Sequence, residues 1–172
     1  MIPKSGNRFS DKIMRRQVVM RIVTALVFAV LAANFTALPA AAAPSIEQLF
    51  HEFGLFGNWA ANCKLPATPA NPYVGITMPS AGLVFEEHNL GPDFAINHYS
   101  VLAATRISAE LLSVNVIFQP GTEVEERQTL VFLVREGTRR TMFNQPDGGA
   151  VRVRDGIALA RGTRTPMLKK CE

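Results

Sequence analysis

Three histidines are the first residues whose type could support metal binding or acid–base chemistry: His51, His88 and His98. The sequence predicts His51 on a short helix and the other two on neighbouring strands of one hairpin. If the turn pairs His88 with about Phe94, the two strand histidines lie roughly 13 Å apart at ~3.3 Å per residue. A zinc ion needs all of its ligands at ~2 Å. We therefore expect half-exposed strand histidines and no metal site.

Catalytic motifs give no stronger signal. The chain contains no His-Glu-x-x-His and no Gly-x-Ser-x-Gly, and its one carboxylate pair on a predicted strand face is Glu123 with Glu125. Asp93, Asp147 and Asp155 fall in turn signals, where the local backbone chemistry of Asp explains them. We expect a protein that is not an enzyme and that carries no cofactor.

Charge is distributed unevenly along the chain. Residues 44–126 hold two basic and nine acidic side chains, whereas residues 127–172 hold ten basic and four acidic ones. One interpretation pairs Glu123, Glu125 and Glu126 with arginines across the sheet, each exposed pair worth a few tenths of a kcal/mol. The other is a basic strand face that binds an anion, such as a lipid headgroup, an acidic polysaccharide or a protein partner.

Arg152 and Arg154 are the basic residues most clearly placed on one face. They alternate with Val151 and Val153, so the two arginines share one side of a strand and the valines share the other. Both interpretations of the charge pattern need this arrangement. Arg152 and Arg154 are therefore candidate ligand-binding residues.

The N-terminal segment has the three parts of a cleavable secretory signal. Six basic residues precede an apolar run over residues 22–33, and a small-residue segment leads to Pro44. The apolar run is shorter than the ~20 residues that span a bilayer. We expect cleavage after Ala42, and hence a mature domain over residues 43–172 in the periplasm or outside the cell, without a transmembrane segment.

Removing the signal changes the charge argument. The whole chain has eighteen Lys and Arg against fourteen Asp and Glu, but six of the basic residues and one acid lie in residues 1–42. The remaining domain has twelve basic and thirteen acidic residues. Nucleic-acid binding, which needs a basic patch on the folded domain, is not expected.

Two cysteines remain in the domain, Cys63 near its start and Cys171 near its end. In an oxidising compartment an even count suggests a disulfide, and two cysteines allow one intramolecular pairing. The bond would place the first and last strands side by side. Two reduced thiols or an intermolecular bridge are the alternatives.

A short helix opens the domain. Ser45 is a plausible N-cap with Gln48 three residues later, apolar residues recur at helical spacing, and Gly54 is suited to the position after the helix end. The Pro-rich residues 65–73 form a stiff connector because proline cannot join the middle of a sheet.

Short strands separated by turn signals fill the rest of the chain. Residues 112–118 alternate apolar and polar side chains, the period-2 pattern of a half-buried strand. The pairs Glu136-Gly137, Asp147-Gly148 and Asp155-Gly156 predict hairpin turns. The predicted strands cover residues 55–63, 82–88, 94–103, 112–118, 124–135, 138–144, 150–154, 157–160 and 167–171.

The pattern predicts an all-β domain, an antiparallel up-and-down β-barrel of about eight strands with a short N-terminal helix. Closing the sheet removes its unpaired edges, and a β-sandwich is the alternative. Gly57-Asn58-Trp59 after a helix resembles the start of lipocalin-like barrels. That resemblance implies that Trp59 packs across the base of the barrel.

A wider resemblance rests on the opening Phe56-Gly57-x-Trp59-x-x-x-Cys63, the following Asn71-Pro72 and the C-terminal Cys. It is similar to a group of small exported bacterial proteins with no assigned function. Invasion-associated exported proteins share the Phe-Gly-x-Trp start but usually carry more cysteines. Small barrel inhibitors of secreted metalloproteases share Gly-x-Trp followed by Cys, with wider spacing.

These observations favour a binding module. The first hypothesis is a small apolar or amphipathic ligand in the barrel mouth, with Trp59 near the closed end as a core anchor or a pocket wall. The alternative is a protein-interaction or protease-inhibitor module that acts through its surface. A cavity of a few hundred Å³ open at one end would support the first, and a solidly packed interior would exclude it.

Overall fold

The computed structural model describes residues 43–172, and the predicted signal segment, residues 1–42, lies outside them. The first element is α2 (Ile46–Glu52). As predicted, Ser45 caps it by accepting a hydrogen bond from the backbone N–H of Gln48, and Gly54 follows the helix with a φ of 62°. No helix within residues 43–172 has the length and apolar composition needed to cross a membrane.

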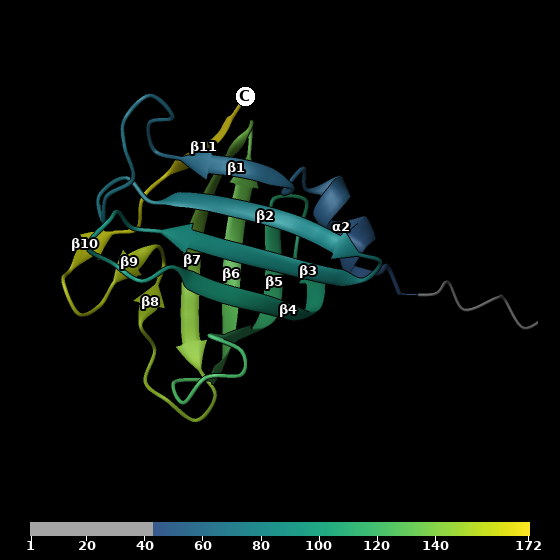
Figure 1. The fold of residues 1–172 in the computed structure, drawn as a ribbon. Coiled ribbons are helices and arrows are strands. Elements are labelled where there is room, and N and C mark those ends of the chain that lie inside the picture. Colours follow the sequence, from purple (N-terminus) through teal and green to yellow (C-terminus); the bar gives the residue numbers. More distant parts are fainter. Residues whose placement is uncertain (1–42) are drawn as a thin grey trace, which may run out of the picture. The chain divides into compact units, whose positions relative to one another are not determined.

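Eight antiparallel strands form a closed barrel (Figure 1). Strands β1 to β7 pair in chain order, and β11 fills the gap between β7 and β1. The predicted barrel is confirmed. Its strands are β1 (Gly57–Ala60), β2 (Tyr73–Ser80), β3 (Leu83–Asn89), β4 (Asn97–Arg106), β5 (Leu111–Phe118), β6 (Glu126–Arg135), β7 (Thr138–Pro146) and β11 (Leu168–Cys171).

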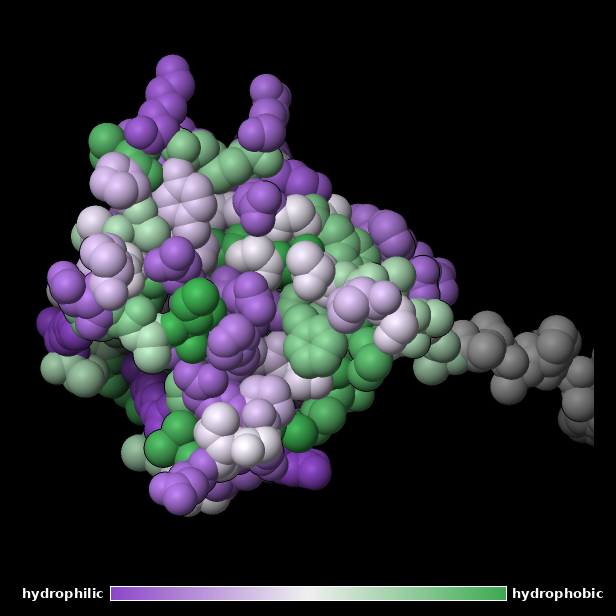
Figure 2. Space-filling model, viewed as in Figure 1, coloured by the Kyte–Doolittle hydropathy of each residue, from purple (hydrophilic) through white to green (hydrophobic). Residues whose placement is uncertain are grey.

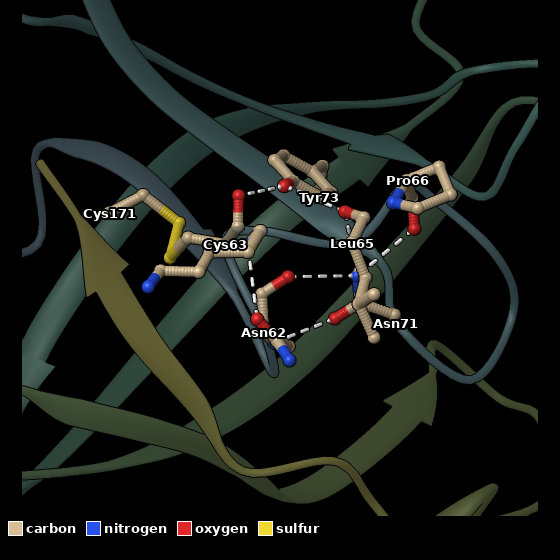
Figure 3. Close-up of a disulfide and its surroundings, with 8 residues drawn as sticks. Asn62, Cys63, Leu65, Pro66, Asn71, Tyr73 and Cys171 are labelled. Atoms are coloured by element: carbon tan, nitrogen blue, oxygen red, sulfur yellow. Dashed lines mark hydrogen bonds between the residues drawn. A yellow bond between two sulfur atoms is a disulfide. The ribbon is translucent and has the colours of Figure 1, made fainter.

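The disulfide joins the segment that follows β1 to the end of β11. Cys63 and Cys171 are bonded, with 5.6 Å between their Cα atoms, and β1 pairs with β11 as predicted. Asn71 and Tyr73 hold the loop beside the bond (Figure 3). The Asn71 side chain bonds the backbone of Asn62, Leu65 and Pro66, and the Tyr73 hydroxyl donates to the carbonyls of Cys63 and Leu65.

Three two-residue strands extend the sheet beyond the barrel: β8 (Val153–Arg154), β9 (Ile157–Ala158) and β10 (Thr163–Arg164). β7 is long enough to pair with β11 near Arg139 and with β8 at Asn144. The β8–β9 turn is the predicted Asp155-Gly156, where both residues have positive φ, as a type I′ turn requires.

The helix α2 lies at one end of the barrel (Figure 1), and its apolar side chains belong to the hydrophobic core. Leu49 and Phe50 of α2 are buried there, and Arg106 at the end of β4 pairs with Glu52 on the helix. Trp59 is 1 % exposed, and its indole N–H donates to the carbonyl of Leu55 at 2.7 Å. This end of the barrel is a packed core.

The observed strands differ from the prediction in several places, and β2 (Tyr73–Ser80) was not among the predicted strands. β1 covers Gly57–Ala60 rather than residues 55–63, and β4 covers Asn97–Arg106 rather than residues 94–103. The turn after β3 is longer than predicted, so His88 pairs with Asn97 and not with Phe94. The predicted separation of the two strand histidines along one ladder was therefore wrong.

Candidate functional site

Polar side chains face the barrel interior at the end away from α2. On β3, Val84, Glu86 and His88 share one face because alternate strand residues point to the same side. Glu86 is directly opposite Tyr99 of β4, which continues this face onto the next strand. The interior therefore changes from apolar near the helix to polar at the opposite end.

Glu86 and Arg139 form a buried ion pair at the boundary between the apolar and polar parts of the interior. The guanidinium Nη1 and Nη2 donate to the two carboxylate oxygens at 3.2 and 2.7 Å, and both side chains are buried. The guanidinium carbon also lies 4.3 Å from the ring centroid of Phe132. Two hydrogen bonds and an aromatic face thus hold Arg139 in one orientation.

The pKa of Glu86 reflects this pairing. Burial alone would raise it, but the charge of Arg139 and the hydrogen bond from His88 outweigh burial and lower the pKa from 4.5 to about 2. His88 Nε2 lies 2.5 Å from Glu86 Oε1. Glu86 is therefore a carboxylate at neutral pH and holds both Arg139 and His88.

A second polar chain runs from the rim into the barrel. Arg152 donates to both oxygens of Glu126 at 2.7 and 2.8 Å, and Gln128 Nε2 donates to Glu126 Oε1 at 2.6 Å. Asn144 Nδ2 then donates to Gln128 Oε1 at 2.8 Å. Asn144 Oδ1 is buried and has no partner among the described residues.

Tyr99 lies between these two polar groups. Its ring centroid is 4.8 Å from that of His88 and 5.2 Å from that of Phe118. Burial raises the pKa of Tyr99 above its ordinary value, and the charge of Glu86 acts in the same direction. The phenol is therefore a hydrogen-bond donor at all physiological pH values.

These side chains border a cavity of about 340 Å³ that is partly open to solvent, here called the inner cavity. Its walls include His88, Tyr99, Phe118, Leu130, Arg139, Asn144 and Arg152. Its size lies at the lower end of the range of small-molecule sites. The mixture of aromatic rings, aliphatic side chains and a few polar atoms is the composition of such sites.

A wider hollow of about 1140 Å³ lies beside it, here called the outer groove. Residues 146–153 and 160–166 form most of its walls. Arg152, Val153, Thr165 and Pro166 border both hollows, so Arg152 stands between them. Its ion pair with Glu126 is half exposed and lies at this boundary.

The residues predicted for ligand binding lie in three different places. Arg152 borders the inner cavity and pairs with Glu126, one of the acids expected to pair with arginines. Arg154 is exposed and lines neither hollow. Trp59 is in the packed core and does not border the inner cavity. The structure brings together only Arg152 and the interior network.

Most of the residues around the inner cavity were not predicted from the sequence. Gln128 alternates with outward-facing residues in the same way as the apolar Leu130 and Phe132, so the predicted strand places all three side chains on one face. That pattern indicated that Gln128 faces inward. Glu86 similarly lies on the same strand face as the apolar Val84. A polar residue on the otherwise apolar face of a predicted strand was therefore the sequence signal that could have indicated the site.

The histidines occupy three separate environments. His51 packs against Phe56 beside α2, His88 faces the inner cavity, and His98 pairs with Glu87 on the outer face of the sheet. Within residues 43–172, no three His, Cys, Asp or Glu side chains gather closely enough to hold a metal ion.

Comparisons of the chain with protein-family models, with curated proteins and with solved structures found no match.

Proposed function

We propose that this protein is an exported binding module that holds a small amphipathic molecule in the inner cavity. The observation that carries the proposal is a cavity inside the barrel that is bordered by an organised polar network, with His88, Tyr99 and Gln128 among its walls. The disulfide supports the exported location, since such bonds persist in oxidising compartments.

Stability alone does not account for the polar network. Burying Glu86 and Arg139 costs solvation free energy that their attraction offsets only in part, and an apolar pair is often at least as stable. An unpartnered buried acceptor adds about 1–3 kcal/mol of cost. Natural proteins carry such departures from an apolar core mainly at functional sites.

The external surface gives less support. On the face of β1 to β4, apolar and polar side chains are interspersed in small patches (Figure 2). Scattered apolar residues are normal on a soluble domain and do not define a docking site. The interior is therefore the better candidate for ligand recognition.

One observation favours a surface interaction as the second candidate. Arg161 and Arg164 border the outer groove, are exposed, and form no ion pair within residues 43–172. An acidic protein segment would match this groove in charge. Under this alternative, filling the inner cavity would leave the function unchanged.

Native mass spectrometry of the protein purified from its own cells tests the proposal. Leu130 is buried on β6 and borders the inner cavity, so Leu130→Trp fills it. Leu133 lies on the other face of the same strand, and Leu133→Trp is the matched control. We expect a small-molecule adduct on the wild type and on Leu133→Trp that is missing from Leu130→Trp.

An adduct that persists on Leu130→Trp contradicts the proposal. A wild-type protein that has only the polypeptide mass in every preparation also contradicts it. Co-purification of a protein that binds the wild type and both variants equally favours the second candidate.

A further inference from the structure

We infer that residues 147–167, which connect β7 to β11, form a lid that opens to admit the ligand to the inner cavity through the outer groove. The inference rests on the proposed function and adds the route by which the ligand enters. Three features of this segment, here called the lid, support it. They are its position between the two hollows, the little apolar surface it buries, and the polar nature of its attachments.

The lid covers a part of the barrel wall that β11 leaves open. β11 pairs with β7 at Thr138 and Arg139, and farther along the same side of β7 the partner is β8, opposite Asn144. β8, β9 and β10 accordingly lie at the end of the barrel away from α2 (Figure 1). The four residues that border both hollows all belong to the lid: Arg152, Val153, Thr165 and Pro166. The lid is therefore the partition between the inner cavity and the outer groove.

Little apolar surface holds this segment in place. None of residues 147–167 belongs to the hydrophobic core, and the one buried residue among them is Gly156, which has no side chain. The flanking residues differ, because Pro146 and Leu168 are both buried. A segment with few buried apolar contacts between two fixed ends can open while the rest of the domain stays folded.

Polar contacts attach β8 and the turn after it to the barrel. The Arg152 N–H donates to the carbonyl of Asn144 at 2.9 Å. The Gly156 N–H donates to the carbonyl of Met142 at 2.9 Å. The Arg152 guanidinium adds its half-exposed ion pair with Glu126. Water can replace each of these contacts when the lid lifts, so the net cost of breaking them is small.

Arg140 of β7 attaches the other end of the lid. Its Nε and Nη2 both donate to the carbonyl of Thr165, at 3.0 and 2.9 Å. Thr165 Oγ1 also donates to the carbonyl of Thr141 at 2.7 Å. Arg140 is half-buried, and hydrogen bonds from a charged donor are stronger than those from a neutral one. Replacing Arg140 should therefore loosen the lid.

Native-state hydrogen exchange of the wild-type domain tests the opening without any ligand. We expect the N–H groups of Arg152 and Gly156 to exchange at least about a hundredfold faster than those of Val114 and Leu130 in the buried strands. Low concentrations of urea should speed exchange in the strands but not in the lid, because local opening exposes little surface. Equal rates with the same urea dependence would overturn the inference.

A variant tests whether the two attachments open together. Arg140→Met removes the bonds to Thr165, and we expect exchange at the Arg152 N–H to become about tenfold faster, because one lid opens as a unit. Arg161→Met changes an exposed arginine of the lid itself and is the matched control, which should keep the wild-type rate. An unchanged Arg152 rate in Arg140→Met would show that no single lid exists.

A disulfide between lid and barrel tests ligand entry. Asn144 and Val153 are directly opposite each other on β7 and β8, and such residues have Cα atoms ~4.5–5.5 Å apart, within the range that a disulfide accepts. We expect the oxidised variant Asn144→Cys with Val153→Cys to exchange benzyl alcohol at least about tenfold more slowly than Asn144→Ser with Val153→Ser. Benzyl alcohol is a small amphipathic probe, and NMR exchange measures the rate. Non-reducing peptide mapping verifies both disulfides.

The outcomes separate the lid from the proposed function. Equal exchange of benzyl alcohol by the cysteine and serine variants overturns the lid and leaves the proposed function standing, since the probe still binds. If benzyl alcohol shifts no resonance of the inner cavity in the wild type, both the inference and the proposed function are contradicted.

Discussion

Glu86 and Arg139 bind each other across the full width of the barrel. β3 and β7 are separated by three strands in either direction around the closed sheet, so the two residues come from diametrically opposite strands. Arg139 rests on Phe132 of the apolar core and also borders the inner cavity. The pair therefore forms the floor of the polar half of the interior.

Removing one partner of this pair should be costly. Glu86→Gln leaves a buried guanidinium without its counter-charge, and we expect the free energy of unfolding to fall by about 3–5 kcal/mol. Urea unfolding measures the change. Glu87→Gln is the matched control on the outer face, where the exposed pair with His98 predicts a loss below about 1 kcal/mol.

Removing both partners should cost less than removing one. We expect Glu86→Met with Arg139→Met to be more stable than Glu86→Gln, since neither variant side chain leaves a charge behind. Equal losses for Glu86→Gln and Glu87→Gln would show that the ion pair does not hold the barrel together.

Acid should weaken the fold through Glu86. Because its folded-state pKa is lowered to about 2, its contribution is fully present above the ordinary value of 4.5 and is lost as the pH falls toward 2. The shift corresponds to about 3 kcal/mol over this window. We expect the stability difference between wild type and Glu86→Gln to shrink steadily from pH 5 to pH 2.

Unfolding experiments at several pH values measure that difference. Other carboxylates titrate in both proteins, so the comparison isolates Glu86. A difference that stays constant from pH 5 to pH 2 would contradict the assigned role of the Arg139 charge.

Arg152 should control exchange between the inner cavity and solvent. It stands between the two hollows, and its half-exposed pair with Glu126 contributes at most about 1 kcal/mol to stability. We expect Arg152→Ala to release a small aromatic probe of the cavity, such as benzyl alcohol, several-fold faster, as measured by NMR exchange, with little change in stability. Arg154→Ala, which touches neither hollow, should leave the rate unchanged, and an equal effect of both variants would refute this role.

Reduction of the disulfide should destabilise the domain strongly. Cys63 and Cys171 are 108 residues apart, and a loop of that size predicts a loss of ~4–5 kcal/mol in the free energy of unfolding. Urea unfolding with and without reductant measures the loss. The variant Cys63→Ser with Cys171→Ser should be insensitive to reductant, and a wild type that is equally insensitive would contradict the prediction.

Local patterns predicted much of this fold. The alternation over residues 112–118 gave β5, the pair Glu136-Gly137 gave the β6–β7 turn, and the two cysteines gave the pairing of the first and last strands. Each of these signals acts within one strand or one turn, or follows from a single possible pairing.

The candidate site depended on features without a local signal. Arg139 and Asn144 are five residues apart on β7, so simple alternation places them on opposite faces. The extra residue Met142 forms a bulge against Val131 and Phe132, and both side chains then face inward. The pairing of Glu86 with Arg139 further depends on the closure of the whole barrel, which no stretch of sequence encodes.

The most direct test of ligand binding inside the barrel is an NMR titration of the isotope-labelled domain with a small-molecule extract from the protein's own cells. We predict that shifts concentrate on His88, Tyr99 and Asn144 and disappear in Leu130→Trp. Shifts confined to the outer groove, shifts that persist unchanged in Leu130→Trp, or no shifts at all would contradict it.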